Sequence, residues 1–192
     1  RGSLVGDGAW LNVCTPESGS RIVIGRNVQV GRQCNLNSGG LIELGDFCLL
    51  GPRAAISNAD HVTSDPMRPY MDQGARLGGA TVVEENCWIG SGAALLGAVT
   101  IGRGSVIGAM AVVLQDAPPM SLLAGNPARL VKLFNPVSGR WERAGTPRER
   151  ERILADRERR PLPDREAYRA MLWEKAMPGG LDPAFAGNGR CL

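Results

Sequence analysis

Residues 83–113 of this chain read VEENCWIGSGAALLGAVTIGRGSVIGAMAVV, and a branched aliphatic residue recurs there at every sixth position. The recurring residues are Val83, Ile89, Leu95, Ile101, Ile107 and Val113. A helix repeats about every 3.6 residues and an alternating strand about every 2, so neither produces this count. A strict hexapeptide repeat indicates a parallel β-helix, in which each short strand forms one wall of a coil.

A second position of each repeat is reserved for small side chains. The fourth residue after each branched one is Cys87, Ala93, Val99, Ser105 or Ala111. We expect the branched side chain to point inward and to stack on its counterpart about 4.8 Å away in the next coil. The corner of a narrow coil then has room only for a small inward side chain. Stacked coils bury one continuous core that a single coil could not form.

The same count runs through the first half of the chain, from Ile24 to Ile56, with a two-residue slip at Ile42-Glu43. It stops at His61. Residues 62–80 have no period and contain two Pro and three Gly, which predicts a loop that leaves the coil.

The chain after the coil has a different composition. Residues 129–175 hold 13 Arg and Lys against 8 Asp and Glu. Charges of both signs are interleaved in this stretch, which favours solvated helices over nucleic-acid binding. We therefore expect a β-helix domain over residues 1–133, with the loop at 62–80, and a partly flexible C-terminal helical extension over 134–192.

Two helices are predicted in the extension. Thr146-Pro147 is typical of an N-cap followed by the first helical residue, and Pro161 would stop that helix. A second helix is expected over 164–176, ended by Pro178-Gly179-Gly180, and the last dozen residues are expected to be disordered. The second helix should dock on the coil or on another subunit.

The five cysteines are scattered and form no CxxC pair, so a metal site is not expected. Cys34, Cys48 and Cys87 fall on the small inward position and resemble core residues. An odd number of cysteines at buried positions favours a reducing compartment, hence the cytoplasm. No apolar stretch approaches the roughly 18 residues of a membrane span, and no secretory signal is visible.

His61 is the only histidine of the chain, and it closes the last repeat before the loop. At a coil corner its side chain should point outward. A neutral imidazole is a natural general base for a hydroxyl or amine nucleophile. A zinc hydratase on a β-helix would need three His ligands, which one histidine excludes.

Three segments together resemble the hexapeptide-repeat acyltransferases: Asn58-Ala-Asp-His61, then CWIGSGAALLGAVTIGRGSVIGAMAVV, then AGNPARLVK. Within that family the chain is similar to the galactoside/maltose O-acetyltransferases, the polysaccharide O-acetyltransferases and the xenobiotic acetyltransferases. The resemblance covers about residues 22–133. It implies an all-β fold built as a left-handed parallel β-helix. It also implies a homotrimer with active sites between subunits, and acetyl-CoA as the acetyl donor.

The resemblance also implies roles for single residues. His61 matches the catalytic base, Asn37 and Asn58 fall where the acceptor binds, and a further set matches the contacts of acetyl-CoA. That set is Trp88, Ser91, Ala109, Arg129 and Lys132. The expected reaction transfers an acetyl group to a hydroxyl of a sugar, a glycan or a glycosylated small molecule. An N-acetyltransferase, an antibiotic-modifying acetyltransferase and a non-catalytic β-helix scaffold remain alternatives.

Overall fold

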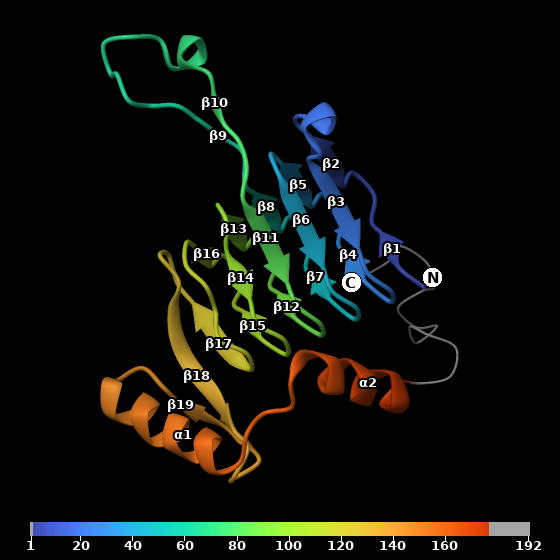
Figure 1. The fold of residues 1–192 in the computed structure, drawn as a ribbon, viewed down its shortest axis with the longest axis vertical. Coiled ribbons are helices and arrows are strands. Elements are labelled where there is room, and N and C mark those ends of the chain that lie inside the picture. The colour runs from blue at the N-terminus through green and yellow to red at the C-terminus, as the bar shows by residue number, and fades with distance from the viewer. Residues whose placement is uncertain (1, 177–192) are drawn as a thin grey trace.

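Successive strands of the chain go to three different sheets in turn, so the backbone winds as a coil with three walls (Figure 1). The computed structural model describes residues 2–176. Wall 1 contains β1 (Leu4–Val5), β4 (Gln29–Val30), β7 (Leu49–Leu50), β12 (Trp88–Ile89), β15 (Val106–Ile107) and β17 (Ser121–Ala124). Wall 2 contains β2 (Trp10–Val13), β5 (Asn35–Ser38), β8 (Ala55–Ser57), β13 (Ala94–Leu96) and β16 (Val112–Val113). Wall 3 contains β3 (Arg21–Ile24), β6 (Leu41–Leu44), β11 (Ala80–Val83) and β14 (Thr100–Ile101).

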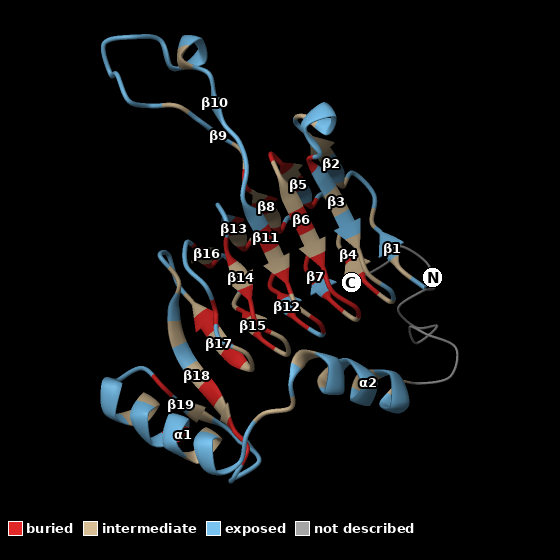
Figure 2. Cartoon of the chain, viewed as in Figure 1, coloured by how far each residue is buried: buried red, intermediate tan, exposed pale blue. Residues whose placement is uncertain are grey.

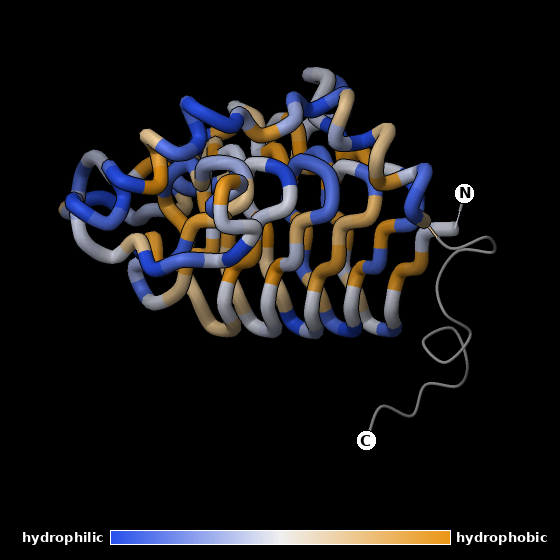
Figure 3. Tube along the Cα trace, turned by 90° about the horizontal axis from the view of Figure 1, so that it is seen from below, coloured by the Kyte–Doolittle hydropathy of each residue, from blue (hydrophilic) through white to orange (hydrophobic). Residues whose placement is uncertain are grey.

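Strand pairing confirms the hexapeptide phase. Ile89 pairs in parallel with Leu50 on one side and with Ile107 on the other. Ile107 lies three hexads further along the chain, so one coil consists of three hexads and three walls. The coils stack in a row, as the view from below shows (Figure 3). Every pairing between coils within the three walls is parallel, as the repeat predicted.

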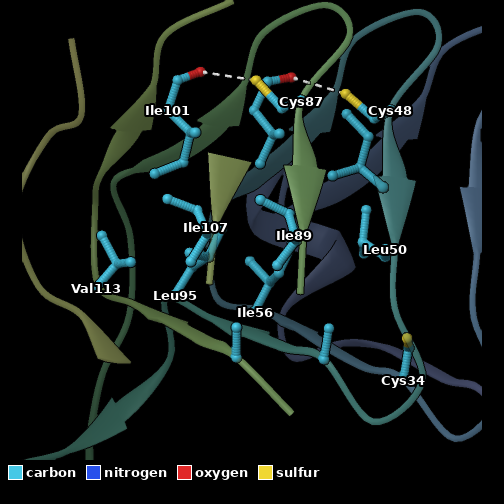
Figure 4. Packing of buried hydrophobic residues seen from close by; sticks show 14 of the residues in the cluster. Cys34, Cys48, Leu50, Ile56, Cys87, Ile89, Leu95, Ile101, Ile107 and Val113 are labelled. Carbon is cyan, nitrogen blue, oxygen red and sulfur yellow. Dashed lines mark hydrogen bonds between the residues drawn. The ribbon is translucent and has the colours of Figure 1, made fainter. Parts of the chain in front are cut away.

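The interior of the coil is one continuous apolar core. Buried residues recur in strand after strand along the coil (Figure 2). The branched residues point inward and stack from coil to coil (Figure 4). Ile56, Ile89, Leu95 and Ile107 are fully buried. The small corner residues are buried as well, among them Cys34, Cys48, Cys87, Ala93 and Ala111. The two-residue slip is accommodated on wall 3, where Ile42 is buried as an additional inward residue next to Leu44.

The non-periodic segment leaves the coil as a projecting hairpin (Figure 1). Its root is a two-residue antiparallel ladder of β9 (Asp60–His61) and β10 (Ala75–Arg76). Its tip contains a 3₁₀ turn over Tyr70–Gln73. Residues 62–80 therefore lie outside the coil for nearly their whole length, but the last of them, Ala80, is already the first residue of β11.

The chain after the coil begins with two strands that the sequence did not predict. β18 (Arg129–Asn135) pairs antiparallel with β17, and β19 (Arg140–Arg143) pairs antiparallel with β18. They extend wall 1 beyond residue 133. The hexapeptide repeat ends before these two strands, so the end of the repeat does not mark the end of the sheet.

The two predicted helices are confirmed at α1 (Pro147–Arg159) and α2 (Arg165–Lys175). Thr146 caps α1: its hydroxyl accepts from the Glu149 N–H while the Glu149 carboxylate accepts from the Thr146 N–H. Ile153 is the buried residue of α1 and packs with Leu133 and Ala144 on the hairpin of β18 and β19. The expected stop at Pro178-Gly179-Gly180 and the expected disorder of the last dozen residues lie outside the described residues.

Helix α2 docks on the coil largely through charges. Arg165 donates from Nη2 to Glu43 at 2.8 Å and from Nε to Glu85 at 3.0 Å. The Tyr168 hydroxyl accepts from Asn86 Nδ2 at 2.7 Å. Neither α1 nor α2, the two α-helices within residues 2–176, has the length and apolar character needed to cross a membrane.

Candidate active site

His61 lies at the root of the projecting hairpin, where the chain leaves the coil. It is the second residue of β9, stands opposite Ala75, and is exposed. The Asp60 carboxylate accepts the backbone N–H of His61 at 2.8 Å, which holds the backbone at this point. The expected outward orientation agrees with this exposure, and the imidazole is accessible to a substrate.

Trp88 lies on the outer face of wall 1. It is 52% exposed and is the outward member of β12, whose inward member is Ile89. In register it stands between Leu49 and Val106 of the neighbouring coils. Leu49 is 38% exposed, so the tryptophan belongs to an outward apolar row. A Trp at this position contributes nothing to the core and is available to another molecule.

One chain does not bring His61 and Trp88 together. His61 follows wall 2 on the hairpin that projects from the coil, whereas Trp88 stands on wall 1 (Figure 1). The coil interior lies between the two walls. A site that contains both residues would therefore need a second copy of the chain.

Ser91 and Ala109 do lie together, at the corner that follows wall 1. With Pro52 they line a groove of about 660 Å³. The backbones are in close contact there: a Cβ added to Gly51 would lie 2.6 Å from the Ser91 nitrogen, and one added to Gly90 would lie 2.5 Å from the Ala109 nitrogen. Within the described residues, the N–H groups of Ser91 and Ala109 make no hydrogen bond. This corner thus offers backbone donors to a bound ligand.

Arg129 and Lys132 share one face of the sheet because β18 contains a bulge. Lys132 stands opposite Leu122 and Arg129 stands opposite Ala124, with Val131 as the extra residue. Leu122 and Ala124 are two residues apart and therefore face the same side. Without the bulge, residues three apart on a strand would face opposite sides. The sequence predicted that both cations lie near one ligand, but it did not indicate the bulge that turns them to the same face.

A second groove, of about 310 Å³, includes Arg129 but not Lys132. Arg150 of α1 lines it as well, together with Leu114 and Gln115. Arg150 was not among the predicted site residues. Its position in a charge-rich helix, among many other arginines, carries no distinguishing signal in the sequence.

The two asparagines expected near the acceptor have different surroundings. Asn58 is 6% exposed, and its amide is fully engaged with the backbone. It accepts from the Gly39 N–H at 2.8 Å and donates to Leu41 O at 2.7 Å. Asn37 lies on the outer face of wall 2, where its Oδ1 accepts from Asn12 Nδ2 at 2.7 Å. The structure therefore gives Asn58 a role in holding the corner from which the hairpin departs.

The inward cysteines are not placed for covalent chemistry. Burial strongly disfavours the thiolate of Cys87 and raises its pKa well above the usual range, with the neighbouring Cys48 adding to the effect. Burial also raises the pKa of Cys34. A buried thiol that stays protonated is a poor nucleophile. The exposed imidazole of His61 is thus a better candidate for the reactive group than these three thiols.

A hollow larger than these two grooves lies elsewhere. It measures about 720 Å³ and is lined by Phe134, Trp141, Tyr168 and Met171, between the hairpin of β18 and β19 and helix α2. None of the site residues expected from the sequence lines it. Size alone therefore does not locate the candidate active site in this chain.

Comparison with known proteins first identifies a class. Residues 80–115 match the family described as bacterial transferase hexapeptide (six repeats). The chain contains hexapeptide repeats and is similar to a named O-acetyltransferase, which confirms the resemblance drawn from its sequence.

Particular relatives follow. The chain is 33% identical over 132 residues to the galactoside O-acetyltransferase of Escherichia coli, covering 68% of this chain and 64% of that protein. It is 34% identical over 114 residues to a Schizosaccharomyces pombe protein that is provisionally assigned as an acetyltransferase, covering 59% of this chain and 54% of that protein. The chain thus spans about half the length of this relative, and 56% of a similar protein from Staphylococcus aureus.

One solved structure resembles the fold over most of the chain. It is that of AntD, an N-acyltransferase from Bacillus cereus, in complex with dTDP and 3-hydroxybutyryl-CoA. The TM-score is 0.51 at 18% identity, covering 82% of this chain and 86% of that chain. At this identity the likeness shows a shared fold.

Proposed function

We propose that this protein is a CoA-dependent acyltransferase that moves an acetyl group from acetyl-CoA to a hydroxyl of a sugar, a glycan or a glycosylated small molecule. The observation that carries the proposal is the position of His61. The only histidine of a hexapeptide-repeat chain stands exposed where the hairpin leaves the coil. The relatives support the same reaction class, because one of them is named a galactoside O-acetyltransferase.

The donor is proposed to lie along wall 1 and the corner that follows it. Free N–H groups of Ser91 and Ala109 would bond the amides of the pantetheine arm, and Trp88 would cover the arm near the acetyl group. Arg129 and Lys132 would face the CoA phosphates. The AntD complex, which contains 3-hydroxybutyryl-CoA, supports acyl-CoA as the kind of donor that this fold accepts.

We further propose that the coil is left-handed and that three copies form a homotrimer with the site between neighbours. Two observations support a shared site. His61 lies on the hairpin that follows wall 2, whereas Trp88 lies on wall 1, where it belongs to an exposed apolar row with Leu49. A neighbour would cover this row and enclose the donor, which a single flat wall cannot do.

The mechanism we propose is direct transfer. Acetyl-CoA supplies an activated thioester. The His61 imidazole takes the proton of the acceptor hydroxyl as its oxygen attacks the thioester carbonyl. Backbone N–H groups stabilise the negative charge that develops on the carbonyl oxygen. The imidazolium then returns the proton to the departing sulfur. Each proton that His61 takes is given back, so the enzyme ends the cycle unchanged.

Transfer to an amine is the alternative, since the same imidazole could serve a sugar amine or an antibiotic. The hairpin over residues 62–80 would decide between the acceptors. Cytoplasmic location is part of the proposal as well. It is supported by the free thiols of Cys14, Cys34, Cys48 and Cys87.

The test is CoA release from acetyl-CoA with a panel of galactosides, maltose and amino sugars. We expect turnover with a hydroxyl acceptor, and a kcat for His61→Ala that is about 10²–10⁴ lower. Glu158→Ala, an exposed change on helix α1 outside the grooves described above, is the control and should retain activity. Circular dichroism verifies the fold of both variants. Near-normal turnover by folded His61→Ala would contradict the general-base role, and turnover with amines alone would favour the alternative.

A further inference from the structure

Two arginines from different elements converge on the groove at the end of the coil. Arg129 is the first residue of β18, and Arg150 lies in the first turns of α1, separated from it by a complete hairpin. Both line the groove of about 310 Å³ that Leu114 and Gln115 also line. The extension therefore contributes a cation to a surface of the coil.

The face of α1 on which Arg150 lies is turned toward the coil. Ile153, three residues further, is fully buried, and Arg157, seven residues further, lies on the same side of the helix. Arg157 is used structurally: it donates to Phe134 O at 2.9 Å and to Pro119 O at 3.1 Å. Arg150 shares this face, yet its guanidinium donates to no group within the described residues.

The groove has an excess of positive charge, because Arg129 and Arg150 line it together with one carboxylate, that of Asp116. Among residues 2–176, neither Arg129 nor Arg150 has a carboxylate oxygen within 4.0 Å, and Arg129 donates only to Ala128 O. Asp116 is the acidic residue of the lining, and its Oδ1 already accepts from the Thr100 N–H at 2.7 Å. Several other arginines of the extension do have a carboxylate partner.

Four of those other arginines are paired with carboxylates. Arg152 pairs with Glu142, Arg159 with Asp156, Arg165 with Glu43 and Glu85, and Arg169 with Asp46. The two arginines of the groove differ from these four in lacking a carboxylate partner. Planar guanidinium groups without a carboxylate partner are suited to bind phosphate through two N–H groups each.

We propose that Arg150 binds, together with Arg129, a phosphate group at the nucleotide end of the CoA donor. The C-terminal extension is then part of the donor site and not only a support for the coil. The inference rests on the proposed function, since CoA is the phosphate-bearing ligand of that reaction. The 3′-phosphate and the pyrophosphate share the same chemistry, so the experiment has to separate them.

The experiment is a calorimetric titration of CoA into the full chain. Arg150→Gln should weaken CoA binding about tenfold, the effect of losing one charge-assisted contact. Arg148→Gln is the matched control: it removes the same charge from the same helix, two residues away, at an exposed position outside the groove. A repeat with dephospho-CoA identifies the phosphate. If Arg150→Gln does not weaken the binding of dephospho-CoA, the contact is to the 3′-phosphate. If it still weakens that binding, the contact is to the pyrophosphate.

Two other outcomes would be negative. Equal affinity of wild type and Arg150→Gln for CoA would overturn this inference and leave the proposed function standing. No CoA binding by the folded wild-type chain would overturn the proposed function and this inference with it. Arg150→Met, which keeps the aliphatic stem against α1 and the coil, replaces the Gln variant if the latter does not fold.

Discussion

At the scale of single residues, two consecutive residues at a corner of the coil can face opposite sides of the wall. Ala93 is fully buried at an inward corner, whereas Ala94, the next residue, is the first residue of β13 and faces outward. The inward site is bounded by corner residues of the coils on either side, Ala54 and Ala111, both fully buried. A larger side chain there would displace backbone, because interiors are close-packed.

Ala93→Leu should therefore lower the free energy of unfolding by about 1–3 kcal/mol through overpacking, or prevent folding. Ala94→Leu is the matched control, since it makes the same substitution one residue away on the outer face and should change stability little. Urea unfolding followed by circular dichroism measures both. Equal midpoints for the two variants would mean that the inward phase assigned to the repeat is wrong.

At the scale of elements, helix α2 is attached to the coil by a buried acid. Asp46 is 3% exposed, and its carboxylate accepts from Arg169 Nε at 2.9 Å and from Trp173 Nε1 at 3.0 Å. Trp173 also stacks edge-on against Phe47, and the guanidinium of Arg26 lies 4.7 Å from its ring centroid. The helix thus contributes cations and an aromatic donor, and the coil contributes the anion.

This attachment should depend on pH. Burial by itself would raise the pKa of Asp46, but the N–H of Arg26, the indole of Trp173 and the charge of Arg169 outweigh it and hold the pKa below its usual value. A lowered pKa stabilises the folded state above the unfolded value, near pH 4, and this stabilisation is lost as pH falls through the lowered pKa.

We expect the difference in unfolding free energy between wild type and Asp46→Asn to be constant from pH 7 to about pH 5 and to shrink below about pH 4. Urea unfolding at several pH values measures it. Arg68→Gln, a change on the projecting hairpin, is a control that should show no such pH-dependent difference. A gap between wild type and Asp46→Asn that stays constant down to pH 3 would contradict the role of the Asp46 charge.

At the scale of the whole molecule, the fold separates two groups that the proposed reaction needs together. His61 projects beyond the coil, and Trp88 stands on wall 1. The row that contains Trp88 continues through Val106 and Leu122 in register. An apolar row exposed on a flat sheet is typical of a surface that another subunit covers.

Two inactive variants should therefore complement each other. His61→Ala and Trp88→Ala chains, unfolded together and refolded as mixed trimers, would form some interfaces with both residues intact. Random mixing predicts about a quarter of wild-type activity, well above either parent. The experiment requires that Trp88→Ala alone is clearly impaired. Activity equal to the average of the two parents would place both residues in one subunit's site or exclude catalysis at the interface.

Much of this architecture could be predicted from the sequence, because the packing of a β-helix depends on residues a fixed number of positions apart in the chain. Each inward residue packs on its counterpart three hexads away, so a periodic sequence alone implies the phase, the walls and the buried cysteines. The starts of the two helices were equally predictable, because Thr146 and Asp164 each cap the first turn of the helix that follows them. The exposure of His61 followed from its place at the end of the count.

Other features depended on contacts that no period encodes. β18 and β19 pair antiparallel, and a bulge at Val131 turns Arg129 and Lys132 to one face. Asn58 is engaged by backbone groups from two distant segments, at Gly39 and Leu41 and at Gly79, and its sequence context resembles that of a ligand-binding residue equally well. Arg150 becomes a candidate donor contact only because α1 folds back over the end of the coil. Periodic packing is decided by neighbours a fixed number of residues apart, whereas these sites are decided by which distant segments meet, and only the tertiary structure contains that information.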